Sequence, residues 1–374
     1  MNLTLQIQLL PERDHARTLQ TTVERFNEAA NWLAGEAFAR QCSNKLVLQK
    51  LFYAELRERF GLSAQMAVRC IARVCEAYKR NKSIRPKFLR HAAMPFDQRM
   101  MSFKGADRVS LLTLNGRVLV AFVMGKYQAE KFTNAKGQAD LVFRDNGKWF
   151  LLVTVDVPAG TKTPATEFLG VDLGVVNIAV DGDGQKHTSE KIEAKRVRYA
   201  TRRRRLGKAT RGAKRSKRRH CHKAMSRSKK REARYRRDVN HQISRQLVAK
   251  AKDTGRGIGL EDLKGIRERT RFRRPQRARV ISWSFFQLRS FVEYKAMLAG
   301  VMFEAVDPRN SSRTCAECGS CAKANRKSQS EFACRACGHK AHADVNSARI
   351  LGFRASAAVN RRMGSEQPLI ASVA

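Results

Sequence analysis

Three short segments, far apart in the sequence, each place a carboxylate where a charge is costly to bury. Asp172 and Glu261 end short apolar runs of the kind that forms buried strands, and Asp344 begins a segment with helical spacing. A charge in such a position loses its hydration, so it is tolerated only when it is paired or binds a metal ion. Any fold of this chain must therefore bring these acids to a place that cations can reach.

The order of predicted elements around the three acids favours one α/β topology. Short apolar runs separated by glycine-rich turns predict strands at residues 168–173, 177–181, 185–187, 257–261 and 301–306. An amphipathic helix is predicted over residues 281–298, and another begins at His342. This is the layout of a ribonuclease-H-like sheet, in which one acid lies on the first strand, a second ends the fourth strand and a third lies on a C-terminal helix.

Three carboxylates in these places suit two-metal phosphodiester chemistry. Two divalent ions about 3.5 to 4 Å apart activate the attacking water and stabilise the leaving oxygen. Mg²⁺ prefers oxygen ligands and keeps several waters, so three or four acidic groups are enough. We therefore predict that Asp172, Glu261 and Asp344 are catalytic and bind Mg²⁺. Asp262 is left outside this set, because an acid at this point is equally suited to capping the next segment.

Two cysteine pairs predict a separate metal site. Cys315 and Cys318 are followed, after 15 residues, by Cys334 and Cys337, and a glycine follows each pair. This spacing is typical of a tetrahedral four-cysteine Zn²⁺ site, and the glycines suit its tight turns. Four thiolates leave no open position for water, so a structural role is predicted for the Zn²⁺. Three nearby residues remain as alternative ligands: Cys321, His339 and His342.

The charge of the chain predicts a polyanionic partner. It carries 75 basic and 33 acidic residues, a formal net charge of +42, and repulsion of this size opposes folding unless an anion neutralises it. The densest segment, Lys195 to Arg237, contains Glu232 as its one acid and is predicted to form one or two long helices. Its contacts would hold a nucleic-acid backbone without reading bases. A nonspecific basic tract is the alternative interpretation.

The N-terminal part is predicted to form two further domains. The first residues alternate apolar and polar side chains as a half-buried strand does, and helical spacing follows. From about residue 95, strand patterns alternate with turn signals such as Asn115-Gly116 and Asn146-Gly147. We predict an antiparallel β-barrel, residues 1–10 and 90–160, that carries residues 11–89 as a helical insertion.

The rest of the chain is divided by the same patterns. The predicted parts are a linker at 161–166, a split nuclease domain at 167–310 and 341–354 with basic helices at 190–251, a zinc-binding insertion at 311–340, and a disordered tail at 355–374. Aromatic residues between 283 and 294 recur at helical spacing and are predicted to lie in the core rather than to stack on bases. They are Trp283, Phe285, Phe286, Phe291 and Tyr294.

These motifs, in this order, resemble a known family. The segments that carry the resemblance are Gly170–Gly174 (GVDLG), Leu260–Leu263 (LEDL), Ser311–Cys315 (SSRTC), the two CxxC-Gly turns and Asp344–Ala348 (DVNSA). Together they are similar to TnpB (OrfB), the transposon-encoded relatives of the type V CRISPR effectors. The resemblance is strongest from residue 168 to about residue 352, and Arg85–Phe88 (RPKF) resembles a short family motif.

The resemblance implies an RNA-guided DNA endonuclease with a split RuvC nuclease domain. Asp172, Glu261 and Asp344 match the catalytic positions of the family, and the four cysteines match its zinc-binding, target-nucleic-acid-binding insertion. The barrel and helical domains would be the wedge and recognition (REC) domains, which read a short motif beside the double-stranded target. The partners would be target DNA and a guide RNA derived from the transposon end, whose base pairing selects the sequence.

Location and alternatives follow from the same comparison. The sequence has neither a signal-peptide pattern nor an apolar stretch long enough for a bilayer, which predicts a cytoplasmic bacterial protein that acts at the nucleoid, as a monomer. A compact type V CRISPR effector shares this architecture and remains an alternative. The intact set of acids argues against a guided binding protein without cleavage. A strand-joining transposase fits poorly with a cysteine module inserted before the last aspartate.

Overall fold

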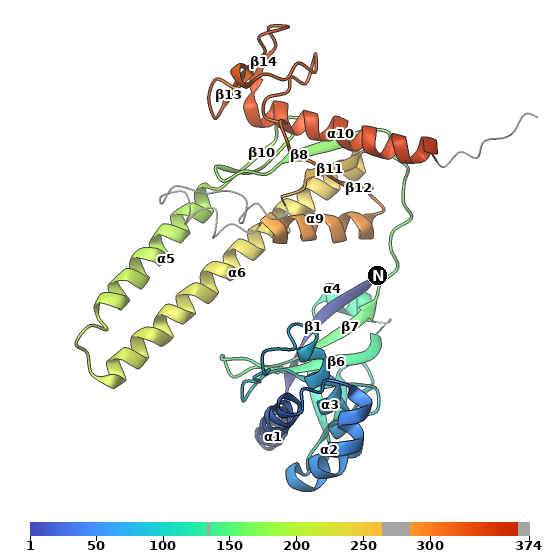
Figure 1. The fold of residues 1–374 in the computed structure, drawn as a ribbon, viewed down its shortest axis with the longest axis vertical. Helices are drawn as coiled ribbons and strands as arrows, with labels where there is room; N and C mark the ends of the chain where they lie inside the picture. Colours follow the sequence, from blue (N-terminus) through green and yellow to red (C-terminus); the bar gives the residue numbers. More distant parts are fainter. Residues whose placement is uncertain (133–134, 264–284, 366–374) are drawn as a thin grey trace, which may run out of the picture. The chain divides into compact units, whose positions relative to one another are not determined.

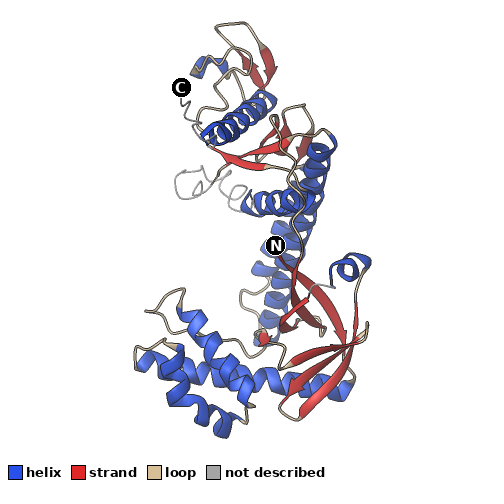
Figure 2. Cartoon of the chain, turned by 90° about the vertical axis from the view of Figure 1, so that its right-hand side faces the viewer, coloured by secondary structure: helices blue, strands red, loops and turns tan. Residues whose placement is uncertain are grey.

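The computed structural model describes residues 1–132, 135–263 and 285–365. The chain divides into two compact units, Met1–Pro158 and Ala159–Ala374, which are described separately as unit 1 and unit 2. Figure 1 labels their elements, and Figure 2 distinguishes helices from strands. None of the helices in these described ranges is both long and apolar enough to span a bilayer.

Unit 1 begins with a strand that leads into three helices. The helices are α1 (Arg13–Ala39), α2 (Lys45–Phe60) and α3 (Ala64–Tyr78). The side chain of Asn44 caps α2 by accepting hydrogen bonds from the backbone N–H groups of Leu46 and Val47, and the side chain of Ser63 caps α3 by accepting one from the N–H of Met66. Gly61 ends α2 with a left-handed backbone (φ 65°), which a residue with a side chain rarely adopts.

The strands of unit 1 form one antiparallel sheet, which is nearly closed into the predicted barrel. Its order is β2-β6-β7-β1-β5-β4-β3, so that β1, at the N-terminus, pairs with both β5 and β7. Helices α1 to α3 lie between β1 and β2 in the chain. The strands are β1 (Asn2–Leu10), β2 (Met94–Phe96), β3 (Met101–Lys104), β4 (Arg108–Thr113), β5 (Gly116–Val123), β6 (Ala135–Phe143) and β7 (Trp149–Asp156), with helix α4 (Lys126–Phe132) after β5.

Unit 2 is built on a mixed five-stranded sheet with the order β10-β9-β8-β11-β12. Strand β9 runs antiparallel to β8 and β10, whereas β11 runs parallel to both β8 and β12. The predicted strands at 177–181 and 257–261 are confirmed to the residue, and the other three within two residues at either end. The strands are β8 (Phe168–Asp172), β9 (Asn177–Asp181), β10 (Lys186–Thr188), β11 (Gly257–Glu261) and β12 (Phe303–Val306).

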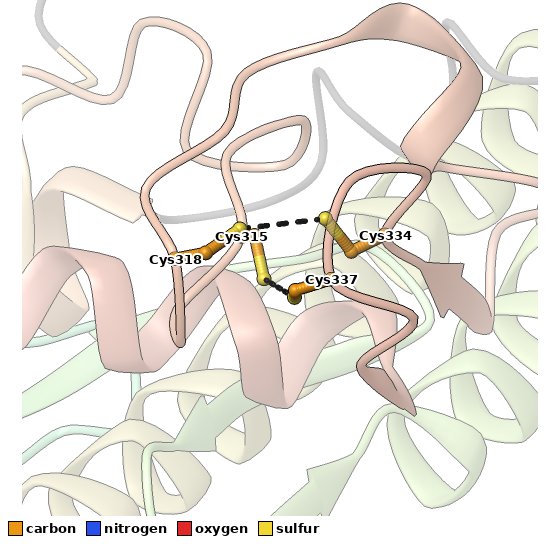
Figure 3. A group of neighbouring side chains, drawn as sticks. All are labelled: Cys315, Cys318, Cys334 and Cys337. Atoms are coloured by element: carbon orange, nitrogen blue, oxygen red, sulfur yellow. Dashed lines mark hydrogen bonds between the residues drawn. The ribbon is translucent and has the colours of Figure 1, made fainter.

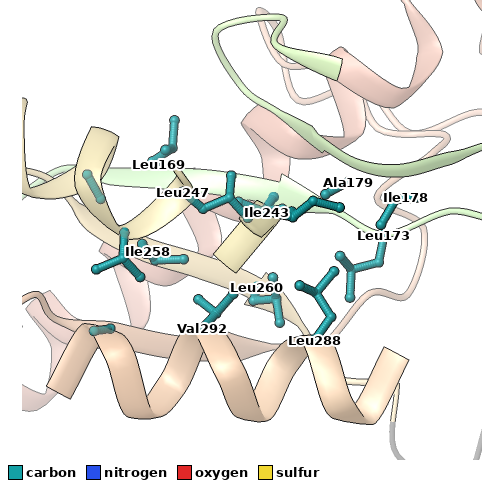
Figure 4. Close-up of a cluster of buried hydrophobic side chains, with 14 of the residues drawn as sticks. Leu169, Leu173, Ile178, Ala179, Ile243, Leu247, Ile258, Leu260, Leu288 and Val292 are labelled. Carbon is teal, nitrogen blue, oxygen red and sulfur yellow. The ribbon is translucent and has the colours of Figure 1, made fainter. Parts of the chain in front are cut away.

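Helices cover both faces of this sheet. The C-terminal half of α6 (Arg215–Asp253) and α9 (Phe285–Ala299) pack on one face, where Leu247, Leu260 and Val292 share a buried apolar cluster (Figure 4). The N-terminal half of α6 instead pairs with α5 (Glu190–Lys208), so the basic segment forms two long helices, as predicted. Helix α10 (Ala343–Ser365) packs on the other face, against β8 and β11.

Glycine lets α10 approach the sheet at backbone distance. A Cβ atom on Gly170, in the middle of β8, would lie 1.8 Å from the carbonyl oxygen of Ala348 in α10. A Cβ on Gly259 of β11 would lie 2.7 Å from the Cβ of Ala355, and one on Gly352 would lie 2.6 Å from the carbonyl oxygen of Phe168. Only glycine allows such contact, so these positions fix how deeply α10 lies on the two central strands.

The prediction of a disordered tail from residue 355 was wrong for its first eleven residues. Helix α10 continues to Ser365, and Ala355 and Val359 are buried with Phe168 and Val306. The reason is that Leu351, Ala355 and Val359 recur every four residues and line one helical face, which a composition rich in alanine and serine conceals. Residues 366–374 lie outside the described ranges, as does the start of the helix predicted over 281–298.

A small cysteine module, residues 311–342, precedes α10. It contains a short 3₁₀ helix, Lys323–Asn325, and an antiparallel strand pair, β13 (Glu331–Ala333) and β14 (Lys340–His342). Its apolar centre is Phe332, packed with Cys315, Cys334 and Ala343. Strand β14 runs directly into α10, so the module ends at the start of the helix that carries Asp344.

Candidate active site and metal centre

The fold brings the three predicted catalytic acids to one edge of the sheet in unit 2. Asp172 is the last residue of β8 and Glu261 is the last residue of β11. These strands are adjacent and parallel, and Val171 lies opposite Leu260, one residue before each acid. Both carboxylates therefore leave the sheet at the same end. Asp344 lies in the first turn of α10, which crosses these strands.

The three acids interact strongly through their charges. Burial and, after it, the nearby charge of Asp344 raise the pKa of Asp172 to about 7, against opposing contributions from Ser347 and Arg326. Burial also raises the pKa of Glu261 well above its usual range, with added repulsion from Asp172 and then Asp344. Clustered acids of this kind hold protons until a cation neutralises them, which is the behaviour expected of a divalent-ion site.

The carboxylates are spaced more widely than the ligands of a single small ion. Among the described residues, the four cysteines form the one group of three or more potential ligand side chains whose ligand atoms all lie within 4.8 Å of one another. The three carboxylates therefore do not form such a group. A two-ion site does not need such close spacing. With ions about 4 Å apart and ligands at about 2.1 Å, oxygens on opposite sides can be as much as about 8 Å apart.

Several polar residues that the sequence analysis missed hold these acids in place. The Ser347 hydroxyl donates a hydrogen bond to Asp172 Oδ1 (3.0 Å), and Asn177 Nδ2 donates to Asp344 Oδ2 (2.9 Å). The backbone N–H of Leu173 donates to Glu261 Oε1 (2.7 Å). Ser347 lies three residues after Asp344, on the same side of the helix, but this spacing does not indicate its hydrogen bond to the distant Asp172.

Two charged residues near the acids have different surroundings. The Arg326 guanidinium, from the cysteine module, lies 3.8 Å from Asp344 Oδ1. Asp262, which the sequence analysis left outside the catalytic set, forms an ion pair with Arg289 of α9. Asp262 therefore helps to attach α9 to the end of β11.

The four predicted cysteines come together in one cluster (Figure 3). Cys315 Sγ lies 3.7 Å from Cys337 Sγ, and Cys318 Sγ lies 3.6 Å from Cys334 Sγ. A tetrahedral ion with bonds of about 2.3 Å to sulfur would separate its ligands by about 3.8 Å, so the cluster has the dimensions of such a site. Backbone hydrogen bonding from Cys337 is the largest contribution to lowering the pKa of Cys334 to about 6, which favours the thiolate that a metal requires.

The turns and the neighbours of the cluster support this ligand set. Gly319 and Gly338 have φ of 71° and 76°, and their N–H groups donate to the carbonyl oxygens of Cys315 and Cys334. The alternative ligands Cys321 and His339 lie outside the group of closely spaced sulfurs. Cys321 is exposed and makes an isolated β-bridge with Thr314.

The basic hairpin of α5 and α6 is the candidate nucleic-acid interface. Glu232, the one acid between Lys195 and Arg237, is buried and pairs with Arg203 (2.6 Å), and Lys195 Nζ lies 3.4 Å from the ring centre of Tyr235. These contacts join the two helices. Between them lies a cavity of about 540 Å³ with predominantly basic walls, lined by Arg198, Tyr199, Thr201, Arg202, Arg205 and Arg231.

The aromatic residues of α9 are divided between the core and the surface. Phe285 is buried, and Phe291 stacks on His241 with ring centres 3.9 Å apart. Phe286 is 76% exposed, so the prediction that it lies in the core was wrong. Its neighbours at Phe285 and Leu288 occupy the face that packs on the sheet, and Phe286 points away from it. Trp283 lies outside the described residues.

Comparison with known families identifies the class of protein that this fold and site resemble. Residues 150–264 match the OrfB_IS605 family model, described as a probable transposase, and residues 285–351 match the model described as Cas12f1-like, TNB domain. These matches confirm the resemblance to OrfB-type proteins and their CRISPR-associated relatives that the sequence motifs indicate.

Individual relatives come from both groups. The chain is 31% identical over 217 residues to the CRISPR-associated endodeoxyribonuclease Cas12f1 of Sulfoacidibacillus thermotolerans, covering 54% of this chain and 49% of that protein. It is 26% identical over 223 residues to InsQ of Escherichia coli K12, named as a candidate RNA-guided DNA endonuclease, covering 54% of this chain and 53% of InsQ. The chain thus spans about half the length of the curated relatives it matches.

A solved structure shares the fold across most of the chain. The structure of a Cas12f1-sgRNA-target DNA complex aligns with a TM-score of 0.62 at 13% identity, covering 89% of this chain and 82% of that one. At this identity the likeness concerns the fold alone.

Proposed function

We propose that this protein is an RNA-guided DNA endonuclease that cleaves phosphodiester bonds with two Mg²⁺ ions in a RuvC-type site. The observation that carries the proposal is the meeting of Asp172, Glu261 and Asp344, whose burial and mutual repulsion favour binding of divalent cations. Asp172 interacts electrostatically with both Asp344 and Glu261 and is the proposed shared ligand. Bound Mg²⁺ would activate a water molecule and stabilise the leaving oxygen.

The charge and the relatives support the guided form of this activity. A net charge of +42 needs more neutralising phosphate than a short DNA site supplies, and a bound RNA together with DNA would provide it. Relatives named for RNA-guided or CRISPR-associated cleavage align with 54% of this chain, and the two family-model matches, residues 150–264 and 285–351, contain the acids and the cysteines. We further propose that unit 1 supplies the wedge and recognition domains that read the duplex beside the target, and that the α5–α6 hairpin holds the nucleic-acid backbone.

Purification of the protein with its bound RNA tests this function. We expect one discrete, structured RNA species to copurify, and we expect the complex to cut DNA that matches the 3′ or 5′ variable part of that RNA when Mg²⁺ is present. A complex programmed with a changed guide segment should cut the correspondingly changed DNA. Random host RNA, with cleavage that ignores the guide sequence, would leave only a basic nuclease.

We also propose that the four-cysteine cluster binds a structural Zn²⁺. Four sulfurs spaced for tetrahedral coordination leave no position for water, so the ion would stabilise the module rather than take part in catalysis. We expect Cys334→Ser to lose the ion and Cys321→Ser to keep one Zn²⁺ per chain, as measured by elemental analysis of the purified proteins. If His339→Ala loses Zn²⁺ and Cys334→Ser keeps it, His339 rather than Cys334 is a ligand of the ion.

A further inference from the structure

The side chain of Asn346, two residues after Asp344, forms hydrogen bonds to the backbone on either side of Cys315, the first ligand of the cysteine cluster. This side chain is fully buried. Its Oδ1 accepts a hydrogen bond from the backbone N–H of Ala316 (3.0 Å), and its Nδ2 donates to the carbonyl oxygen of Thr314 (2.7 Å). These two backbone groups flank Cys315. The first turn of α10 is therefore attached to the loop that places a metal-binding sulfur.

Ser347, the next residue, connects the same module to another acid. It is 2% exposed, and its hydroxyl lies 3.0 Å from Asp172 Oδ1 and 3.1 Å from the hydroxyl of Ser311, at the start of the module. Arg326 of the module adds a third connection through its ion pair with Asp344. Two of the three acids thus have partners that are themselves held by the cysteine module.

We propose that Asn346 and Ser347 are positioning residues that couple the metal-bound cysteine module to the carboxylates of the active site. The inference rests on the proposed role of these carboxylates as the Mg²⁺ site. The buried amide of Asn346 uses both its donor and its acceptor, so α10 cannot shift against the Cys315 loop without leaving buried polar groups unpaired. If the module lost its ion, the two hydrogen bonds of Asn346 would break. Ser347, the next residue of α10, would then no longer hold Asp172 in position.

Coupling between two sites is reciprocal, so it can be measured without nuclease activity. If the cysteine module stabilises the Mg²⁺ site, bound Mg²⁺ must stabilise the cysteine module to the same extent. The experiment measures the Zn²⁺ affinity of the full chain by equilibrium competition with a chromogenic chelator that has negligible affinity for Mg²⁺, with and without saturating Mg²⁺. We expect Mg²⁺ to tighten Zn²⁺ binding by the unaltered protein about five- to tenfold.

Variants separate coupling from simple loss of stability. We expect Asn346→Ala and Ser347→Ala to reduce the effect of Mg²⁺ to less than about twofold, and Ser347→Thr, which keeps the hydroxyl, to restore it. Asn325→Ala is the matched control. Asn325 is also fully buried, and its side chain bonds Arg313, Ser320 and Arg335 within the module. This variant should bind Zn²⁺ more weakly under both conditions while keeping the effect of Mg²⁺.

The outcomes distinguish this inference from the proposed function. Calorimetry first establishes whether Mg²⁺ binds and whether Asp172→Ala removes the binding; no such binding would overturn the Mg²⁺ site and the inference with it. If Mg²⁺ binds but leaves the Zn²⁺ affinity unchanged, the Mg²⁺ site stands and the coupling is disproved. The coupling through Asn346 is equally disproved if Asn346→Ala keeps the full effect of Mg²⁺, or if Asn325→Ala loses it to the same degree.

Discussion

Asp172→Asn is expected to abolish guided DNA cleavage, with a loss on the order of a thousandfold or more in the single-turnover rate. Asparagine has nearly the same shape, but its neutral amide cannot replace a carboxylate that two cations share. Asp172 also contributes to the raised pKa of Glu261, so its charge is felt across the site. The rate is measured with the RNA-bound protein at saturating concentration over its matching DNA.

The same substitution is expected to raise stability when divalent ions are removed. Burial raises the pKa of Asp172 from 3.8 to about 7, so the folded state prefers the protonated acid and loses stability as the pH rises from about 4 to about 7. Asp172→Asn removes this penalty, which is on the order of a few kcal/mol at neutral pH. Thermal unfolding in a chelator across this pH range should show the gain growing with pH.

Asp262→Asn is the matched control for this prediction. It changes the next acid after Glu261 in the same way, but Asp262 pairs with Arg289 and stands outside the proposed site. We expect it to keep cleavage within about threefold while losing a little stability, because a partly exposed ion pair contributes on the order of 1 kcal/mol or less. If Asp172→Asn still cleaves DNA, or if Asp262→Asn loses as much cleavage activity, Asp172 is not the catalytic ligand that we propose.

The sequence was sufficient to place the acids because strands and burial impose strict local rules. An apolar run of five residues that ends in a carboxylate has few stable settings, and both Asp172 and Glu261 were found at the ends of adjacent parallel strands. The cysteines were equally predictable, since their spacing alone defines the ligand geometry. Each of these signals is contained in a short stretch of the chain, so it can be recognised from the local sequence alone.

The residues that hold the site together could not be predicted in this way. Asn346 acts on backbone groups 30 and 32 residues earlier in the chain, and Ser347 acts on an acid 175 residues away. A single asparagine or serine in a helix is unremarkable until its distant partners are known. Likewise, the helical continuation after Leu351 depends on Phe168 and Val306, which bury its apolar face. Tertiary contacts, rather than local preference, decide such features.

Gly170→Ala is expected to cause the largest loss of stability of any single-methyl change in unit 2. The added Cβ would lie 1.8 Å from the carbonyl oxygen of Ala348 and 2.4 Å from the backbone nitrogen of Gly352. Overpacking against side chains costs about 1 to 3 kcal/mol, and here the contacts are backbone atoms that cannot rotate away. We expect the free energy of unfolding to fall by at least about 3 kcal/mol, as measured by chemical denaturation.

This substitution also tests whether close packing of α10 sets the active site. Relief of the clash requires α10 to move away from β8, which would carry Asp344 away from Asp172 and remove cleavage even where the protein stays folded. Gly207→Ala adds the same methyl group in α5, where no atom lies within 4 Å, and should be neutral or stabilise by up to about 1 kcal/mol. The prediction is contradicted if Gly170→Ala has the same free energy of unfolding and the same cleavage rate as the unaltered chain. In that case this contact would determine neither how deeply α10 lies on the sheet nor where Asp344 is placed.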